Sequence, residues 1–266
     1  MKPTGTLAKM SRPTVQELRA VSQPNAIVGR ISAEHWIGRL WTRRVSIHIT
    51  RVLVGGATTA NQITFFMIAL GFGAAAGLLV AGVVGALLAV VGIQLYLLAD
   101  CVDGEIARWK GTTSARGAYL DRVGHYVVEA ALLSAYGFHV GQSWTSGWVS
   151  IGIATALLAI LTKAETDLIP IHLYPDDSED RYHEIITPKV SVWRRLRALT
   201  HPLKIHRWTG AAEASLLMLA AAIAASLGWD DAERALALTL FAVSAVLVVG
   251  HAISIWTSKR LDVESA

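Results

Sequence analysis

The segment from Asp100 to His125 places acidic, small and basic side chains between two long apolar runs. A carboxylate at the end of an apolar run is costly, and such a residue normally marks a functional site. Asp100 and Asp103 are three residues apart and therefore share one face of a helix. Gly117, Asp121 and His125 repeat every four residues, which also predicts a single helical face.

Two such faces turned toward each other would place three carboxylates and an imidazole around one point. Hard divalent cations prefer oxygen ligands, and a cation held by a few carboxylates keeps positions for phosphate oxygens. The small residues Gly104, Ala107 and Gly117 would let a phosphate ester lie against the backbone. The residues therefore predict a site for a divalent cation and a phosphate ester.

The spacing Asp100-x2-Asp103-Gly104-x2-Ala107-Arg108-x8-Gly117-x3-Asp121 resembles the signature of the CDP-alcohol phosphotransferases, integral membrane enzymes of phospholipid synthesis. In that family a further aspartate follows after three more residues, and His125 occupies that place here. The preceding segment from Thr59 to Thr64 resembles the family's Pro-Asn-x-x-Thr opening of the first membrane helix, with Ala60 where proline is usual.

The resemblance implies an activity and a set of site residues. In the family, acids hold two divalent ions, Mg²⁺ or Mn²⁺, on the diphosphate of a CDP-alcohol, commonly CDP-diacylglycerol. An acceptor hydroxyl attacks the phosphorus that bears the alcohol, and CMP leaves. Carried over by position, the metal ligands are Asp100, Asp103 and Asp121, the nucleotide and phosphate site is lined by Asn61, Thr64, Gly104, Ala107 and Gly117, and Arg108 holds phosphate.

His125 is the departure from the family pattern, whose last aspartate is both a metal ligand and the proposed general base. A neutral histidine can take either role but brings no negative charge. One hypothesis is an active transferase with His125 as base and ligand, with one or two bound ions and a preference for Mn²⁺. The alternative is an altered or inactive nucleotide-binding membrane homologue.

Several other polar residues lie near the predicted membrane surface. Glu129, four residues beyond His125, is predicted to hydrogen-bond the imidazole and fix its tautomer; a simple interhelical bond is the alternative. Arg116 and Arg122 are candidates to bind a phosphorylated acceptor. Glu213 is expected to face a cavity, because an acid facing lipid is costly. The identity of the acceptor alcohol does not follow from these residues.

The composition predicts a polytopic membrane protein. Of the 266 residues, 53% are hydrophobic and 17% are charged, and the mean hydropathy is +0.45. About 20 apolar residues span a bilayer, and abundant glycine and alanine allow helices to approach closely. We predict an all-α integral membrane protein with six transmembrane helices, near residues 62–80, 83–108, 118–140, 148–166, 209–227 and 235–257.

Residues 1–57 are predicted to form a cytoplasmic amino-terminal extension, and residues 58–266 the six-helix catalytic domain. The extension contains a predicted amphipathic helix between Ala33 and Leu53, lying in the headgroup layer; packing on a soluble partner is the alternative. A basic segment from Lys189 to Arg207 is a candidate headgroup cradle or a positive anchor. Positive charge near the ends of six alternating spans predicts that both termini and the motif face the cytoplasm, in the cell membrane.

The predicted partners are a CDP-alcohol donor, an alcohol acceptor and membrane lipids, with no nucleic acid. Because family members are often homodimers, the resemblance also implies a dimer. A transporter is the remaining alternative, but the chain shows no detectable inverted repeat, and its acids cluster at a helix end rather than along a path.

Overall fold

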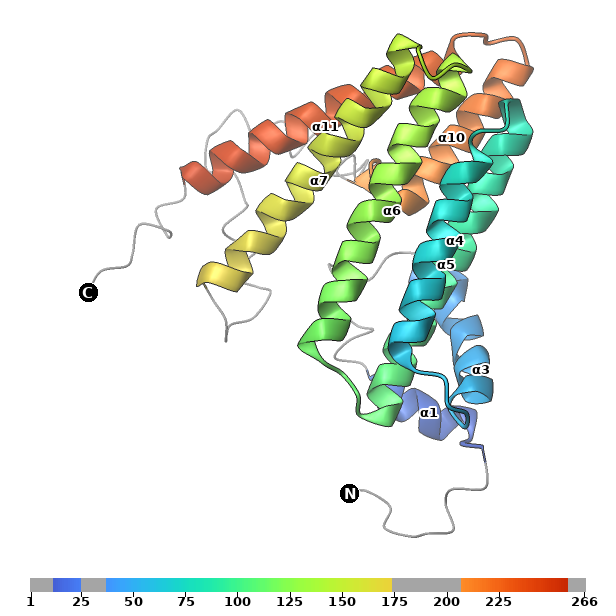
Figure 1. The fold of residues 1–266 in the computed structure, drawn as a ribbon, viewed down its shortest axis with the longest axis vertical. Helices are drawn as coiled ribbons and strands as arrows, with labels where there is room; N and C mark the ends of the chain where they lie inside the picture. The colour runs from blue at the N-terminus through green and yellow to red at the C-terminus, as the bar shows by residue number, and fades with distance from the viewer. Residues whose placement is uncertain (1–11, 25–36, 174–206, 258–266) are drawn as a thin grey trace. The chain divides into compact units, whose positions relative to one another are not determined.

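The computed structural model describes residues 12–24, 37–173 and 207–257 (Figure 1). Over these residues the chain is helical and contains no strand, which confirms the all-α prediction. The elements in chain order are α1 (Val15–Ser22), η1 (Gly38–Thr42), α3 (Arg43–Leu53), α4 (Ala60–Gly77), α5 (Gly82–Lys110), α6 (Ala115–Gly141), α7 (Gly147–Leu173), α10 (Ala211–Ser226) and α11 (Ala232–Trp256).

Six of these helices lie where six membrane spans were predicted. Within the described part of the chain, four are long and apolar enough to cross a membrane, namely α4, α5, α7 up to Leu168 and α11. The helix α10 is apolar but has only 16 residues, and α6 carries Asp121, His125, Glu129 and His139 along its length. That α6 and α10 also span the membrane, which would make six spans, therefore stays a prediction.

The chain divides into two compact units. The first comprises residues 1–71 and 91–125, and the second comprises residues 72–90 and 126–266. All four motif side chains, Asp100, Asp103, Asp121 and His125, belong to the first unit. That unit also contains α1 and α3. These amino-terminal helices therefore belong to the same compact body as the part of α5 that carries Asp100 and Asp103, and α5 is called the motif helix below.

The helix α1, within the stretch assigned to the amino-terminal extension, begins at a capping box. The backbone N–H of Glu17 donates to Thr14 Oγ1 over 3.2 Å, and the backbone N–H of Thr14 donates to the Glu17 carboxylate over 2.8 Å. These reciprocal bonds satisfy donors that a helix start leaves unpaired. The side chains of Leu18 and Ser22 are buried, so α1 packs against the rest of its unit.

The predicted amphipathic helix is present as α3, preceded by the π-helical turn η1. The buried face of α3 carries two hydroxyl side chains, Ser46 and Thr50, together with Ile47, while Val45 and Val52 are exposed. The sequence pattern predicted a helix in the headgroup layer with its apolar residues toward the membrane interior. The hydroxyls are buried because they meet an acid of α5, described below. That α3 lies in the headgroup layer of the membrane stays a prediction.

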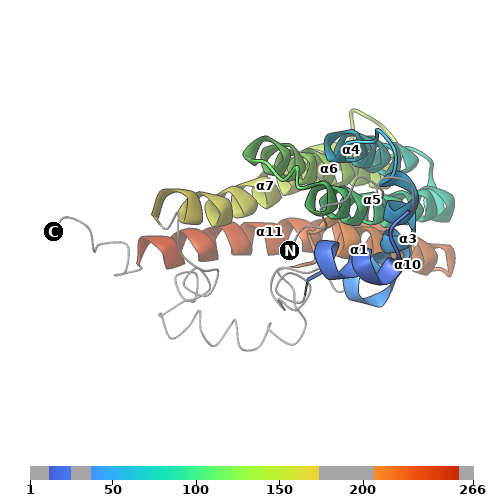
Figure 2. The ribbon, with the colours of Figure 1, turned by 90° about the horizontal axis from the view of Figure 1, so that it is seen from below.

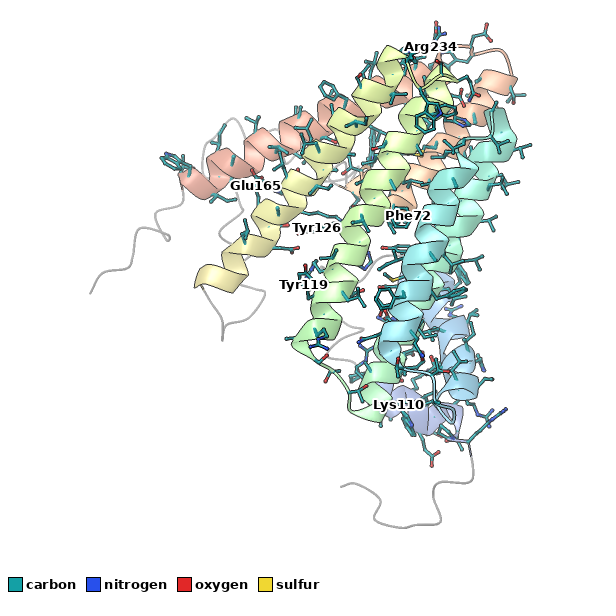
Figure 3. The ribbon with its side chains drawn as sticks, in the orientation of Figure 1. Phe72, Lys110, Tyr119, Tyr126, Glu165 and Arg234 are labelled. Atoms are coloured by element: carbon teal, nitrogen blue, oxygen red, sulfur yellow. The ribbon has the colours of Figure 1, made fainter. Side chains whose placement is uncertain are left out.

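The end of α5 is fastened to the loop between α3 and α4. Lys110, labelled in Figure 3, donates from Nζ to the carbonyl oxygens of Gly56 and Thr58, both over 2.8 Å. Gly111 follows with a φ of +64°, a left-handed conformation that glycine adopts without a steric penalty and that commonly ends helices. These contacts define where the motif helix stops.

The second unit is built on close helix packing. The helices α7 and α11 run side by side, and α10 packs on α11 (Figures 1 and 2). The helices α6 and α7 cross at two glycines: a Cβ on Gly152 would lie 2.8 Å from the carbonyl oxygen of Leu133 and 2.9 Å from Cα of Gly137. The backbones therefore approach as the abundance of small residues predicted.

Candidate active site

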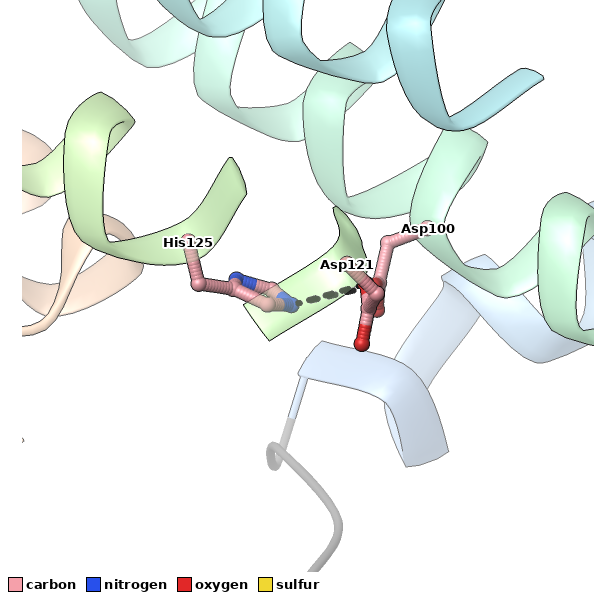
Figure 4. A group of neighbouring side chains, drawn as sticks. All are labelled: Asp100, Asp121 and His125. Atoms are coloured by element: carbon pink, nitrogen blue, oxygen red, sulfur yellow. Dashed lines mark hydrogen bonds and ion pairs between the residues drawn. The ribbon is translucent and has the colours of Figure 1, made fainter. Parts of the chain in front are cut away.

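The candidate site is formed by α5 and α6 within the first unit. One oxygen of Asp100, one of Asp121 and one ring nitrogen of His125 all lie within 4.8 Å of one another (Figure 4). The distance from His125 Nε2 is 3.1 Å to Asp100 Oδ1 and 3.5 Å to Asp121 Oδ1. The four-residue spacing of Asp121 and His125 thus places both on one face of α6, turned toward the acids of α5.

This group of atoms fits a divalent cation. Asp121 Oδ1 is buried and accepts no hydrogen bond from the described residues. A buried polar atom without a hydrogen bond is costly, and a cation would supply the missing interaction. Two carboxylate oxygens suit Mg²⁺ or Mn²⁺, while an added imidazole nitrogen favours Mn²⁺ over the harder Mg²⁺.

Asp103 was predicted as a further ligand, and the structure places it beside the three-residue group rather than in it. Its side chain is buried, and Oδ2 accepts a hydrogen bond of 2.7 Å from Thr64 Oγ1. Thr64, which was predicted to line the phosphate site, therefore orients an acid of the cluster.

The imidazole of His125 is held from both sides. Nε2 faces the two acids, and Nδ1 is in a hydrogen bond with the hydroxyl of Tyr96, a side chain buried in α5. The two rings meet edge to face, with centroids 5.5 Å apart and an interplanar angle of 87°. Sequence reasoning missed Tyr96. Its signal was available, because Tyr96 precedes Asp100 by four residues and so shares its helix face.

Glu129 was predicted to hydrogen-bond this imidazole, and the structure gives its oxygens other partners. Glu129 Oε2 lies 2.6 Å from Nζ of Lys163, and Oε1 accepts from the backbone N–H of Ala211 over 3.4 Å. The ammonium group is a charged partner that a neutral imidazole cannot match. In the structure the partner of His125 Nδ1 is Tyr96, and Glu129 makes the interhelical contacts that were the alternative.

A buried acid that the sequence analysis did not single out lies inside the motif. Glu105 is fully buried and accepts three hydrogen bonds, from Gln23 Nε2 over 2.7 Å, Ser46 Oγ over 2.6 Å and Thr50 Oγ1 over 2.6 Å. Arg43 Nη1 lies 3.8 Å from its Oε1. Because these partners come from the segment after α1 and from α3, Glu105 ties the amino-terminal elements to the motif helix.

Arg108 makes a second tie of this kind. Its Nε donates to the carbonyl oxygen of Ser22, at the end of α1, over 2.6 Å. Its guanidinium group covers Gly104, since a Cβ there would lie 3.0 Å from Nη1 and 3.2 Å from Nη2. The absence of a side chain at Gly104 thus leaves room for the guanidinium group of the arginine four residues later.

Two predicted nucleotide-site residues lie together at the starts of α4 and α6. A Cβ on Gly117 would lie 3.5 Å from Asn61 Oδ1 and 3.4 Å from Ser114 Oγ, whose hydroxyl accepts from the Gly117 N–H over 3.1 Å. Ala107 is half-buried on α5. Gly117 thus lies against the side chains of Asn61 and Ser114, and the nucleotide site that the resemblance implies stays a prediction.

The candidate acceptor residues are dispersed. Arg116 and Arg122 are exposed on α6, and the charge of Arg122 interacts with Asp121. Glu213 lies in the first turn of α10, in the second unit, and is half-buried. Residues 174–206 are outside the described part of the chain, and all of the basic segment from Lys189 to Arg207 except Arg207 lies there.

The described residues are helical, four of their helices are long and apolar enough to cross a membrane, and a carboxylate–imidazole cluster lies between α5 and α6. These features define an integral membrane protein with a candidate metal site. Residues 57–172, which include all of the motif, match the family CDP-alcohol phosphatidyltransferase. This segment is therefore similar to CDP-alcohol phosphatidyltransferase domains, an assignment that the motif spacing predicted.

A curated relative supports this assignment. The bifunctional IPC transferase and DIPP synthase of Aquifex aeolicus (strain VF5) is 35% identical to this chain over 109 residues, which are 41% of this chain and 24% of that protein. The chain thus spans about a quarter of the length of that relative.

Proposed function

We propose that this protein is a membrane phosphotransferase that moves a substituted phosphoryl group from a CDP-alcohol to an acceptor hydroxyl. With CDP-diacylglycerol as donor, the group is phosphatidyl and the reaction belongs to phospholipid biosynthesis. The observation that supports the proposal most directly is the cluster of Asp100, Asp121 and His125 inside the segment that matches the family. Asp103, held by Thr64, adds a fourth side chain beside it.

In this proposal the three aspartates hold one or two Mg²⁺ or Mn²⁺ ions against the diphosphate of the donor. When bound, such ions neutralise the diphosphate and stabilise the charge that develops on the leaving CMP. The new bond joins the acceptor oxygen to the phosphorus that bears the alcohol, and the bond from that phosphorus to the CMP oxygen breaks. The hydroxyl proton passes to His125.

In this proposal His125 acts through one ring nitrogen. Nδ1 is in a hydrogen bond with Tyr96, so Nε2 is the atom that faces Asp100 and Asp121. An aspartate has two oxygens and can ligate a cation while it accepts a proton. Because Nε2 carries one lone pair, His125 acts either as the base or as a ligand at any moment. We assign it the base's role during transfer, which leaves the cation to the aspartates.

We also assign roles to the remaining predicted residues. We assign the nucleotide and its phosphates to the surface formed by Asn61, Gly104, Ala107 and Gly117, with the terminal nitrogens of Arg108 toward phosphate. Thr64 acts through Asp103. Arg116 and Arg122 are exposed cations near the start of α6 and suit a phosphorylated acceptor. Glu213 and Glu129 are assigned structural roles in the second unit.

We further propose that the helices α4, α5, α6, α7, α10 and α11 span the cell membrane, with the motif and both termini on the cytoplasmic side, where a cytidine nucleotide is available. The distribution of lysine and arginine supports this orientation. A homodimer is expected by family resemblance.

The test is CMP release by the purified protein in nanodiscs, with CDP-diacylglycerol, Mg²⁺ or Mn²⁺, and a panel of acceptors that includes the substrates of the Aquifex relative. The variants are His125→Ala and His125→Asp. His48, an exposed histidine of α3, supplies the matched control His48→Ala. We expect acceptor-dependent release by the wild type and by His48→Ala, and a loss of about 10²- to 10⁴-fold in His125→Ala, the range for a general base.

Other outcomes are equally informative. Release only after His125→Asp would favour the alternative, a homologue whose natural site is altered and binds nucleotide without transfer. Equal release by the wild type and His125→Ala would remove His125 from the proposed chemistry. Transport of a small solute without CMP release would place the protein in another class.

A further inference from the structure

Tyr96 is buried, comes from outside the motif and contacts the one motif residue that departs from the family pattern. A phenol hydroxyl both donates and accepts hydrogen bonds, so it can serve either tautomer of the imidazole. A carboxylate accepts only. The partners on the two sides of His125 therefore differ in the tautomers that they allow.

The partners of the two ring nitrogens favour one of these tautomers when the imidazole is neutral and Asp100 is ionised. Nε2 lies 3.1 Å from Asp100 Oδ1, and an ionised carboxylate oxygen accepts a hydrogen bond only from a nitrogen that carries a proton. For a neutral imidazole with its proton on Nε2, Nδ1 is an acceptor and the Tyr96 hydroxyl donates to it. In this tautomer Nε2 has no lone pair to offer to a cation or to an acceptor hydroxyl.

Any chemical role for His125 requires the other tautomer. Whether Nε2 takes a proton or binds a cation, its lone pair must be free, and the ring proton must then be on Nδ1. The only change this asks of Tyr96 is a rotation of its hydroxyl, after which its oxygen accepts from Nδ1–H. Its burial and the edge-to-face contact of the rings hold the phenol in place for both arrangements.

We propose that Tyr96 is the positioning residue of His125: it accepts the Nδ1 proton when a divalent cation occupies the aspartates, and so presents the Nε2 lone pair to the site. The inference deepens the proposed function and rests on it for the role of His125. Partners of this kind fix the ring and the tautomer of functional histidines, and their loss typically costs about 10- to 100-fold in metal affinity or activity.

The test follows the tautomer directly. Protein labelled with ¹⁵N in the histidine rings is measured by NMR in nanodiscs, with and without Mg²⁺, which is diamagnetic; His125→Asn identifies the resonances of His125. We expect the wild type to change from the Nε2–H form to the Nδ1–H form when Mg²⁺ is added. Tyr96→Phe keeps the ring but removes the oxygen, so we expect it to retain the Nε2–H form at the same Mg²⁺ concentration.

A matched control is available in the second unit. Tyr136 is also buried, and its hydroxyl donates to the carbonyl oxygen of Glu233 over 3.2 Å. Tyr136 lies outside the motif segment. The substitution Tyr136→Phe therefore removes a buried phenol hydroxyl that does not belong to the candidate site. It should leave the response of His125 to Mg²⁺ unchanged.

A double-mutant cycle on CMP release separates positioning from a general loss of stability. Tyr96→Phe should lower kcat about 10- to 100-fold in the wild-type background and have no further effect in the His125→Asp background, because a carboxylate has no tautomer to set. An equal loss in both backgrounds would overturn the proposal. So would a Tyr96→Phe protein that takes the Nδ1–H form as readily as the wild type, or a wild type that keeps Nε2–H at saturating Mg²⁺.

The NMR measurement needs no turnover. A tautomer change without CMP release from any acceptor would contradict the proposed function and leave the role of Tyr96 standing. CMP release without a tautomer change would support the proposed function and contradict the role of Tyr96.

Discussion

Glu105 offers the sharpest test of how the motif helix is held. It is fully buried and accepts three hydrogen bonds, from Gln23, Ser46 and Thr50, with Arg43 close by. The substitution Glu105→Ala leaves these donors facing a small cavity. We expect α1 and α3 to detach from α5 far more often than in the wild type, while the helices of the second unit keep their protection.

The magnitude follows from the bonds that are lost. A hydrogen bond to a charged group contributes about 1.5–3 kcal/mol. The three share one carboxylate and are not additive, and removing one partner of a buried charged network costs about 3–5 kcal/mol. At about 1.36 kcal/mol for each factor of ten, the opening equilibrium of α1 and α3 should rise by about 200- to 5,000-fold.

The assay is hydrogen–deuterium exchange with mass spectrometry on the purified protein in nanodiscs. Peptides covering residues 15–22 and 43–53 report on the two amino-terminal helices, and peptides from α11 serve as an internal control. Ser46→Ala and Thr50→Ala each remove one donor and should produce smaller increases. Glu105→Gln keeps the shape and one acceptor oxygen, so its effect should lie between those of the wild type and Glu105→Ala.

Two results would refute the reasoning. Unchanged exchange of α1 and α3 in Glu105→Ala would mean that other contacts hold these helices. An equal rise in α11 would mean that Glu105 supports the whole fold rather than the attachment of the amino-terminal elements.

Three further predictions concern the site and the packing. Thr64→Val removes the 2.7 Å donor to Asp103, and the released acid should weaken Mn²⁺ binding, measured by electron paramagnetic resonance, by about 5- to 100-fold; unchanged affinity would exclude Asp103 from the cation site. Gly152→Val forces a Cβ into the backbone of α6, where 2.8 Å is available, and overpacking of about 1–3 kcal/mol should lower the apparent Tm in nanodiscs; an unaltered Tm would contradict the close crossing. Backbone and side-chain hydrogen bonds from Thr14 hold the pKa of Glu17 below its ordinary value of 4.5, so its stabilisation of α1 is present above that pH and is lost as the pH falls through the lowered pKa; helical ¹³Cα shifts of residues 15–22 should decline with acid in the wild type and not in Glu17→Gln.

Much of the architecture followed from the sequence because membrane helices carry their signal locally. Long apolar runs predicted helices at the places where α4, α5, α6, α7, α10 and α11 lie, since backbone polar groups in lipid must be satisfied within the helix. The motif was equally local: spacings of three and four residues place Asp100 with Asp103, and Asp121 with His125, on single helix faces. These periodicities predicted the cluster before any tertiary contact was known.

Other features depended on which helices meet, and the sequence does not state that. A short capping box at Thr14 and Glu17 predicts a helix start, but only packing shows that α1 and α3 are tied to Glu105 and Arg108. The partner of His125 was equally undetermined, because Glu129 and Tyr96 both had suitable helical spacing. In the structure Tyr96 is the hydrogen-bond partner of His125 Nδ1, and Glu129 pairs with the ammonium group of Lys163. Periodicity within a helix determined the faces, and the contacts between helices decided which groups on those faces became partners.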